Sequence, residues 1–317
     1  MLLEAIKAFI IGVVEGITEW LPISSTGHMI LVDEFIKLQV SEEFLELFLV
    51  VIQLGAIMAV FFLYFGKLNP FSAKKDQGEK KRTWKLWGMV VIGCIPAAVI
   101  GLSLDDFFHD NFYSATTVSI ALVFYGIVFI VIEYLQKKKH GSVSLGLVPE
   151  QRGKHARPLP GATAGSSGAG VGGTAISYKI NAVEDITIKT ALIIGLFQML
   201  AIIPGTSRSG STIIGGLLAG CSRVAAAEFS FFLAIPVMFG WGLLKALKYL
   251  LNIGLSMTSV EIVVLAVGII TAFGVSLFAI RFLIGFVKKH SFIPFGIYRI
   301  FVGIVVIAFF AASGSLF

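Results

Sequence analysis

Two carboxylates, Glu15 and Glu19, stand four residues apart inside an apolar stretch of the sequence. This spacing puts them on one face of a helix, where close carboxylates repel each other unless a proton or a cation lies between them. Mg²⁺ or Ca²⁺ would suit the pair, because both are hard cations that take oxygen ligands. The alternative is a pair that only shares a proton in a polar contact between helices. We expect Glu15 and Glu19 to be catalytic and to bind the metal.

A run of hydroxyl groups that ends in an imidazole follows these carboxylates: Ser24, Ser25, Thr26, Gly27 and His28. The run falls where the next helix should begin, and the backbone N–H groups of a helix start favour an anion. A histidine whose pKa lies near neutral can act as a general acid or base, so the nucleophile could be Ser25 or a water activated by His28, or His28 itself. We expect Ser25 and His28 to be catalytic, and Ser24, Thr26 and Gly27 to bind the substrate.

A second polar stretch surrounds Arg208 with hydroxyl and amide groups, from Pro204 to Thr212. The planar fork of arginine matches phosphate oxygens, which predicts a phosphate clamp. An ion pair with Glu15 or Glu19 is the alternative. We expect Arg208 to be catalytic. The further residues expected to bind the substrate are Gln53, Ser207, Ser209, Gly210 and Thr212.

The elements that carry these residues are membrane helices. The chain has 317 residues, of which 56% are hydrophobic and 14% charged, and its mean hydropathy is +0.91, far from the averages of a soluble domain. Apolar segments long enough to cross a bilayer lie at 44–65, 86–104, 115–135, 224–248, 259–284 and 292–313. These features predict an all-α integral membrane protein with about six full transmembrane helices.

Basic residues gather in three loops, at 66–85, 136–189 and 285–290. The positive-inside rule makes these loops cytoplasmic and places both termini outside. The net charge of +6 therefore reflects topology, and no nucleic-acid partner is expected.

Two further apolar stretches, 5–35 and 190–220, are broken by proline, glycine and hydroxyl residues, which predicts re-entrant helical hairpins. The segments 12–27 and 195–210 align without a gap, so the chain is interpreted as internally duplicated. The charge rule opens the two hairpins in opposite directions, as in an inverted-topology repeat. The prediction is a single polytopic domain, 1–317, with repeats at 1–136 and 190–317 and a flexible cytoplasmic linker at 137–189.

Some buried groups are expected to be structural. Cys94 and Cys221 lack the spacing of a disulfide or metal site and are interpreted as small buried hydrophobes. Arg299, inside the last apolar segment, is expected to form an ion pair with Glu46 or Glu228.

The residues at 15–28 and 204–212 resemble the two motifs of the undecaprenyl-pyrophosphate phosphatases, also called the bacitracin-resistance proteins, and the resemblance covers nearly the whole chain. It implies an inverted-repeat membrane fold, a divalent metal, and hydrolysis of undecaprenyl diphosphate to undecaprenyl phosphate and inorganic phosphate. Such an enzyme recycles the lipid carrier of peptidoglycan synthesis and confers bacitracin resistance. The linker at 137–189 is longer than the connection usual in that family.

The resemblance also implies a bacterial plasma-membrane protein whose site opens to the extracytoplasmic side. The catalytic set carried over by motif position is Glu15, Glu19, Ser25, His28 and Arg208, and the sequence leaves a homo-oligomer open. A lipid flippase or an anion transporter is the main alternative, because broken helices in inverted repeats also describe secondary transporters. A carrier, however, needs no nucleophile beside a carboxylate pair.

Overall fold

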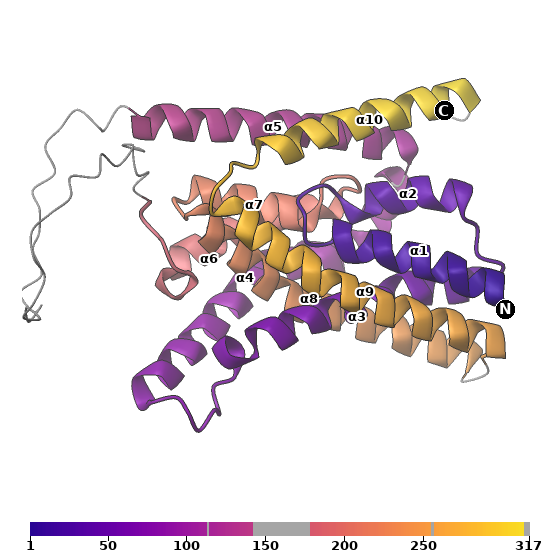
Figure 1. The fold of residues 1–317 in the computed structure, drawn as a ribbon, viewed down its shortest axis with the longest axis horizontal. Helices are drawn as coiled ribbons and strands as arrows, with labels where there is room; N and C mark the ends of the chain where they lie inside the picture. The colour runs from indigo at the N-terminus through magenta and orange to yellow at the C-terminus, as the bar shows by residue number, and fades with distance from the viewer. Residues whose placement is uncertain (113, 142–177, 255–256, 314–317) are drawn as a thin grey trace, which may run out of the picture.

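The structure is a computed structural model that describes residues 1–112, 114–141, 178–254 and 257–313. Helices make up nearly all of the described chain, and they run largely along the long axis of the molecule (Figure 1). Within the described residues, the only β-type pairing is an isolated bridge between Ile180 and Cys221. The predicted all-α class is therefore confirmed.

Six of the described helices are long and apolar enough to span a membrane. They are α3 (Glu42–Leu68), α4 (Gln77–Phe112), α5 (Ala115–Gly141), α8 (Arg223–Ile253), α9 (Ser259–Val287) and α10 (Ile293–Ser313). Each apolar segment expected from the sequence falls on one of these helices to within a residue. The chain is a multi-pass membrane protein.

The two broken stretches form pairs of shorter helices. The first pair is α1 (Leu2–Thr18) and α2 (Ser25–Phe35); the second is α6 (Ile188–Met199) and α7 (Arg208–Leu218), with a 3₁₀ turn, η2 (Leu200–Ile202), between them. Each break contains a proline, Pro22 or Pro204, which cannot donate the backbone hydrogen bond that would continue a helix. That these pairs turn back within the membrane remains a prediction.

The second helix of each pair begins with the same cap. Ser24 and Ser207 have φ values of 75° and 73°, a left-handed region that is costly for residues other than glycine. Each side chain accepts a hydrogen bond from the backbone N–H three residues later, at 3.3 Å from Gly27 and 3.1 Å from Gly210. These hydrogen bonds offset part of the strain and fix where α2 and α7 begin.

The packing of the two halves has a matching pattern. Helix α1 packs on α9 as α6 packs on α4, and α3 packs on α9 as α8 packs on α4. Helices α5 and α10 lie side by side along one edge (Figure 1), and they cross at Gly126 and Gly296, where a Cβ on either glycine would lie 2.7 Å from the other's carbonyl oxygen. This pattern is what duplication would produce, and the division into two repeats remains a prediction.

The linker predicted at 137–189 is shorter than expected at both of its described ends. Helix α5 continues to Gly141, and residues 178–187 pack against both halves of the chain, through α4 and α8, instead of forming a flexible segment. Ile180, Val183 and Ile186 are buried, and Lys67 binds Glu184 at 3.0 Å. These three apolar side chains gain by leaving water, which explains why this end of the predicted linker packs on the helices. The Gly/Ala/Ser-rich part at 161–173 lies outside the described residues.

The ion pair predicted for Arg299 is wrong. Glu46 binds Lys245 at 3.1 Å and Glu228 binds Lys67 at 2.8 Å, so both proposed partners pair with lysines on neighbouring helices. Arg299 instead donates to backbone carbonyl oxygens, because the end of each broken helix leaves carbonyls that need a donor.

The two cysteines have no disulfide partner, as expected. Cys221 is fully buried, and burial raises the pKa of its thiol to about 12, so the thiol stays protonated and unreactive. Cys94 is half-buried on α4.

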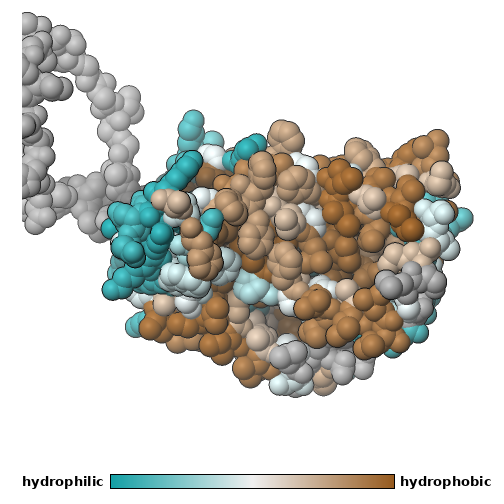
Figure 2. Space-filling view, turned by 90° about the horizontal axis from the view of Figure 1, so that it is seen from below, coloured by the Kyte–Doolittle hydropathy of each residue, from teal (hydrophilic) through white to brown (hydrophobic). Residues whose placement is uncertain are grey.

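The surface separates into apolar and polar regions. Figure 2 shows a broad hydrophobic face, with hydrophilic side chains gathered at the end where α4 begins and α5 ends. Helix α1 begins and α10 ends at the opposite end of the molecule (Figure 1). The described basic loops at 66–85 and 285–290 therefore lie at the opposite end from the start of α1 and the end of α10, as the charge pattern requires.

Candidate active site

The two broken-helix loops meet at a cavity of about 160 Å³ between the halves of the chain. Its polar lining comes from both loops and from α3: Glu19, Ser25, Thr26, Gln53, Ser207, Arg208 and Ser209. Val237, Met238 and Trp241 of α8 line it as well. Of the thirteen residues predicted for the site, these seven polar ones line one cavity.

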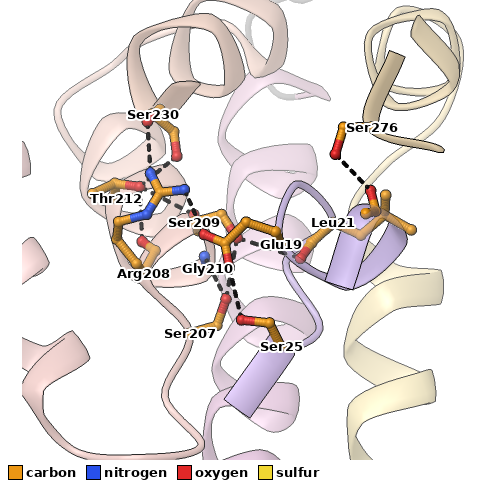
Figure 3. Close-up of polar contacts among 11 residues, drawn as sticks. Glu19, Leu21, Ser25, Ser207, Arg208, Ser209, Gly210, Thr212, Ser230 and Ser276 are labelled. Carbon is orange, nitrogen blue, oxygen red and sulfur yellow. Dashed lines mark hydrogen bonds and ion pairs between the residues drawn. The ribbon is translucent and has the colours of Figure 1, made fainter. Parts of the chain in front are cut away.

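Glu19 connects the two loops at this cavity. One carboxylate oxygen, Oε2, accepts a hydrogen bond of 2.8 Å from the Ser25 hydroxyl, and the other, Oε1, accepts one of 3.0 Å from Nη2 of Arg208 (Figure 3). The side chain of Glu19 is 7% exposed and that of Arg208 is 12% exposed, so the ion pair is shielded from bulk solvent. A serine hydroxyl, a carboxylate base and a guanidinium thus stand in one chain of contacts.

Arg208 is fixed on its other side by α8. Its Nη1 donates to the carbonyl oxygen of Ser230 at 2.9 Å, and Thr212 donates to the Ser230 hydroxyl at 2.7 Å (Figure 3). Thr212 is fully buried and does not line the cavity, so it supports Arg208 from behind. The sequence reasoning missed Ser230, although a hydroxyl close after Glu228 in an apolar helix was a usable signal.

The start of α7 presents polar groups to the same cavity. The hydroxyl groups of Ser207 and Ser209 lie 3.2 Å apart, and Ser209 donates to the Leu21 carbonyl oxygen at 3.3 Å. The backbone N–H of Gly210 is taken up by the Ser207 cap. The remaining N–H groups of this first turn and the helix dipole favour an anion.

The start of α2 is built in the same way. Ser24 is buried and caps the helix through Gly27, so these two residues shape the turn, whereas Thr26 lines the cavity. Gln53 reaches the cavity from α3. The structure thus separates the predicted substrate-binding residues into groups that face the cavity and groups that hold the turns.

His28 does not reach Ser25. Its Nδ1 lies 2.7 Å from the carbonyl oxygen of Ser24, and its Nε2 lies 2.8 Å from the hydroxyl of Tyr298 on α10. Because a carbonyl oxygen only accepts, Nδ1 carries a proton, and in the neutral ring Nε2 accepts from Tyr298. The Ser25 hydroxyl donates to Glu19 instead, so Glu19 and not His28 is the hydrogen-bond partner of Ser25, one of the nucleophile candidates.

Glu15 does not line the cavity. Its side chain is buried, and Oε1 has no hydrogen-bond partner among the described residues, although the charges of Glu19 and Arg208 are close. A buried carboxylate oxygen without a partner is costly, and a proton or a cation would relieve that cost. The described residues hold no group of three or more acidic, histidine or cysteine side chains in metal-binding proximity.

Glu15 and Glu19 could hold the hard cation, Mg²⁺ or Ca²⁺, that the sequence predicts, but two carboxylates are too few for a zinc site. Mg²⁺ is commonly held by one or two carboxylates, with substrate phosphates and waters completing its shell, whereas structural zinc sites use four protein ligands. Glu15 and Glu19 match the first pattern.

Comparison with known proteins shows the family of this chain. A family model described as bacitracin resistance protein BacA matches residues 8–305, which include both loops, five of the six long helices in full and α10 up to residue 305. The chain belongs to the BacA family. A relative from Enterococcus faecalis, named undecaprenyl-diphosphatase, is 51% identical over 307 residues, which are 97% of this chain and 98% of the relative.

Two further BacA relatives carry the same name. The protein from Desulfitobacterium hafniense is 48% identical over 312 residues, covering 98% of each chain. The protein from Acetivibrio thermocellus is 47% identical over 311 residues, covering 98% of this chain and 99% of the relative. Because the matches run nearly end to end, they include both broken-helix loops as well as the membrane helices.

Proposed function

We propose that this protein hydrolyses undecaprenyl diphosphate to undecaprenyl phosphate and inorganic phosphate. The observation that carries the proposal is the chain of contacts from Ser25 through Glu19 to Arg208 at the wall of one cavity. The relatives named undecaprenyl-diphosphatase support the choice of substrate. In a bacterium, this reaction returns the lipid carrier to peptidoglycan synthesis and counters bacitracin.

The head group is bound by the second loop in this proposal. Arg208 offers its guanidinium to the oxygens of the terminal phosphoryl group, and Ser207, Ser209 and the first turn of α7 add hydroxyl and N–H donors. Charge that builds on the transferred group and on the leaving phosphate is stabilised by these fixed donors.

The first loop supplies the nucleophile. The Ser25 oxygen attacks the terminal phosphorus, its proton passes to Glu19, and the bond from phosphorus to the oxygen of the leaving polyprenyl phosphate breaks. Glu19 gives that proton to the leaving polyprenyl phosphate. A water then attacks the phosphoserine and passes a proton to Glu19, the bond from phosphorus to the Ser25 oxygen breaks, and Glu19 returns the proton to that oxygen as inorganic phosphate leaves. His28 holds the turn before Ser25 through the Ser24 carbonyl and exchanges protons with the exterior through Tyr298.

A divalent cation, Mg²⁺ or Ca²⁺, would be held by Glu15 and Glu19 together with diphosphate oxygens. When bound, it supplies the positive charge that lets an anionic substrate approach two carboxylates. The unpartnered Oε1 of Glu15 supports this assignment.

The polyprenyl chain has a place beside the head-group cavity. A second cavity of about 450 Å³ lies between α4, η2 and α8, and its lining is mostly apolar. It shares Ala201, Arg208, Val237 and Trp241 with the first cavity, so a diphosphate at Arg208 can extend its isoprenyl tail directly into it. Such a tail is itself apolar and gains by leaving water for this groove.

Hydrophilic side chains gather at the end of the molecule where α4 begins and α5 ends (Figure 2), and the positive-inside rule makes that end cytoplasmic. We place the opening of the site at the other, extracytoplasmic end. A lipid flippase or an anion transporter is not favoured, since a carrier has no use for a serine hydroxyl bonded to a carboxylate.

The test is phosphate release from undecaprenyl diphosphate by the purified protein in detergent, with and without Mg²⁺ or Ca²⁺. Release that needs the cation and occurs without any membrane to cross supports the enzyme. A folded protein that releases no phosphate with any cation refutes the proposal, and transport assays in vesicles would then be the next step.

A further inference from the structure

Arg299 is a fully buried arginine in the middle of an apolar helix. It lies on α10, within the span Ile293–Ala312, and none of its surface is exposed. A guanidinium stays charged in proteins, and a buried charge is normally paired with a carboxylate. Among the described residues, no carboxylate lies within ion-pair distance of Arg299. This charge needs another explanation.

The guanidinium instead joins the two broken-helix loops. Nη1 donates to the carbonyl oxygen of Pro22 at 3.3 Å, while Nη2 donates to the carbonyl oxygens of Gly205 at 2.8 Å and Thr206 at 3.0 Å. The planar fork of arginine reaches carbonyls on both sides at once, which the single ammonium of a lysine cannot do. The ring of Tyr125 on α5 lies 5.9 Å from the guanidinium carbon and adds a weak cation–π contact.

The three carbonyls stand directly before the residues of the active site. Pro22 lies between Glu19 and Ser25, and Gly205 and Thr206 lead into Ser207 and Arg208. A shift of either loop would lengthen the contacts of 2.8 and 3.0 Å that Glu19 makes with Ser25 and Arg208. Misplacement of about 1 Å in a catalytic group can cost a hundredfold in rate.

The charge of Arg299 also lies close to the head-group cavity. A Cβ built on Gly210, in the first turn of α7, would stand 3.3 Å from Nη1 of Arg299. Since Arg208 is already paired with Glu19, Arg299 is the nearby positive charge that no described carboxylate neutralises. Its field therefore adds to that of the α7 helix dipole, which also favours an anion.

We propose that Arg299 is a positioning residue for phosphoryl transfer: it fixes the two loops against each other and supplies a positive field to the diphosphate. It touches neither the substrate nor the reacting atoms. The inference rests on the proposed function, and its test carries a binding measurement that does not depend on turnover.

The experiment compares Arg299→Gln and Arg299→Lys with Arg223→Gln as the matched control. Arg223 is a partly buried arginine that joins α8 to Glu133 of α5 with contacts of 2.8 and 2.6 Å, and it does not line the cavity. We measure the melting temperature, kcat and KM for phosphate release, and the rise in melting temperature caused by inorganic pyrophosphate with Mg²⁺.

Arg299→Gln should lower kcat about a hundredfold in the folded protein and reduce the pyrophosphate-induced rise. Arg299→Lys, which keeps the charge but reaches one loop, should retain the pyrophosphate effect and recover only about a tenth of the parent kcat. Arg223→Gln should lower the melting temperature while kcat stays at the parent value.

The proposal is overturned if the folded fraction of Arg299→Gln keeps the parent kcat, because Arg299 would then only stabilise the fold. A full recovery of kcat by Arg299→Lys would overturn the two-loop tether. If the parent itself releases no phosphate, the proposed function fails, and an unchanged pyrophosphate effect in Arg299→Gln would separately refute the field that we assign to Arg299.

Discussion

The two broken-helix loops have the same backbone conformation at their helix caps but carry side chains of different chemistry. Each has a proline in the break and a serine cap with left-handed φ, Ser24 in one and Ser207 in the other. The residue after the cap is the nucleophile candidate Ser25 in the first loop and Arg208, the candidate phosphate clamp, in the second. In the mechanism that we propose, this geometry handles a proton in the first loop and binds a phosphate in the second.

Glu19 is the residue that makes the two loops into one site. It accepts hydrogen bonds from Ser25 and Arg208, which occupy equivalent positions in their loops. The first loop also places Glu15 where the second has Gln198, and both are buried with unpartnered side-chain atoms. The comparison teaches that a symmetric frame positions the groups, while the differences at equivalent positions supply complementary charge.

The largest effect is expected where the loops join. Glu19→Gln removes the base for Ser25 and the counter-charge for Arg208 with little change in shape, so phosphate release should fall by about 10³-fold or more. Glu46→Gln is the matched control, because Glu46 is an exposed carboxylate that also pairs with a basic residue, Lys245, but does not line the cavity. Equal activity of Glu19→Gln and the parent would contradict the role of Glu19 as the residue that joins the two loops into one site.

Arg208→Lys probes the anion-binding half and should have the next largest effect. The lysine keeps a positive charge but loses the fork that binds Glu19 and the Ser230 carbonyl together, so kcat should fall by about 10²-fold. Arg208→Ala should in addition destabilise the protein by about 3–5 kcal/mol, because Glu19 stays buried without its partner. Kinetics and thermal unfolding measure the two effects separately, and a stable, fully active Arg208→Lys would contradict the clamp.

The sequence was enough to predict the two motifs and the long helices, because both depend on local patterns. Glycine, proline and hydroxyl residues mark each loop, and continuous apolar runs mark the spans. It was not enough for contacts between distant segments. The partners of Arg299 are backbone carbonyls, which no residue type reveals, and the preference of Ser25 for Glu19 over His28 depends on how the turn at 19–24 closes.

Substitutions of His28 and Tyr298 test whether the hydrogen bonds from Ser24 through His28 to Tyr298 contribute to the reaction. His28→Ala removes the hydrogen bond to the Ser24 carbonyl that steadies the cap, so phosphate release should fall by about 10- to 100-fold. Tyr298→Phe keeps the stacked ring, 5.6 Å from His28, and loses only the hydroxyl, so the loss should be several-fold. A larger loss in Tyr298→Phe than in His28→Ala would reverse the roles that we assign.

A smaller effect than at Glu19 or Arg208 should come from the apolar cavity, where we place the tail and not the reacting groups. Gly101 lines this cavity on α4, and a Cβ there would meet no atom within 4 Å, so Gly101→Phe can fill the groove without disturbing the helix. Gly88 lies on the same helix with equally open space but outside the cavity, which makes Gly88→Phe the matched control.

Gly101→Phe should lower kcat/KM for undecaprenyl diphosphate about tenfold and leave that for a short farnesyl diphosphate nearly unchanged, because one blocked aromatic-sized volume removes on the order of 1–3 kcal/mol of apolar contact. Gly88→Phe should change neither. If both substrates are affected equally, the phenylalanine acts on the head-group cavity instead, and the tail lies elsewhere. A loss restricted to the long chain would show that the two loops act on the diphosphate while the surrounding helices select the lipid.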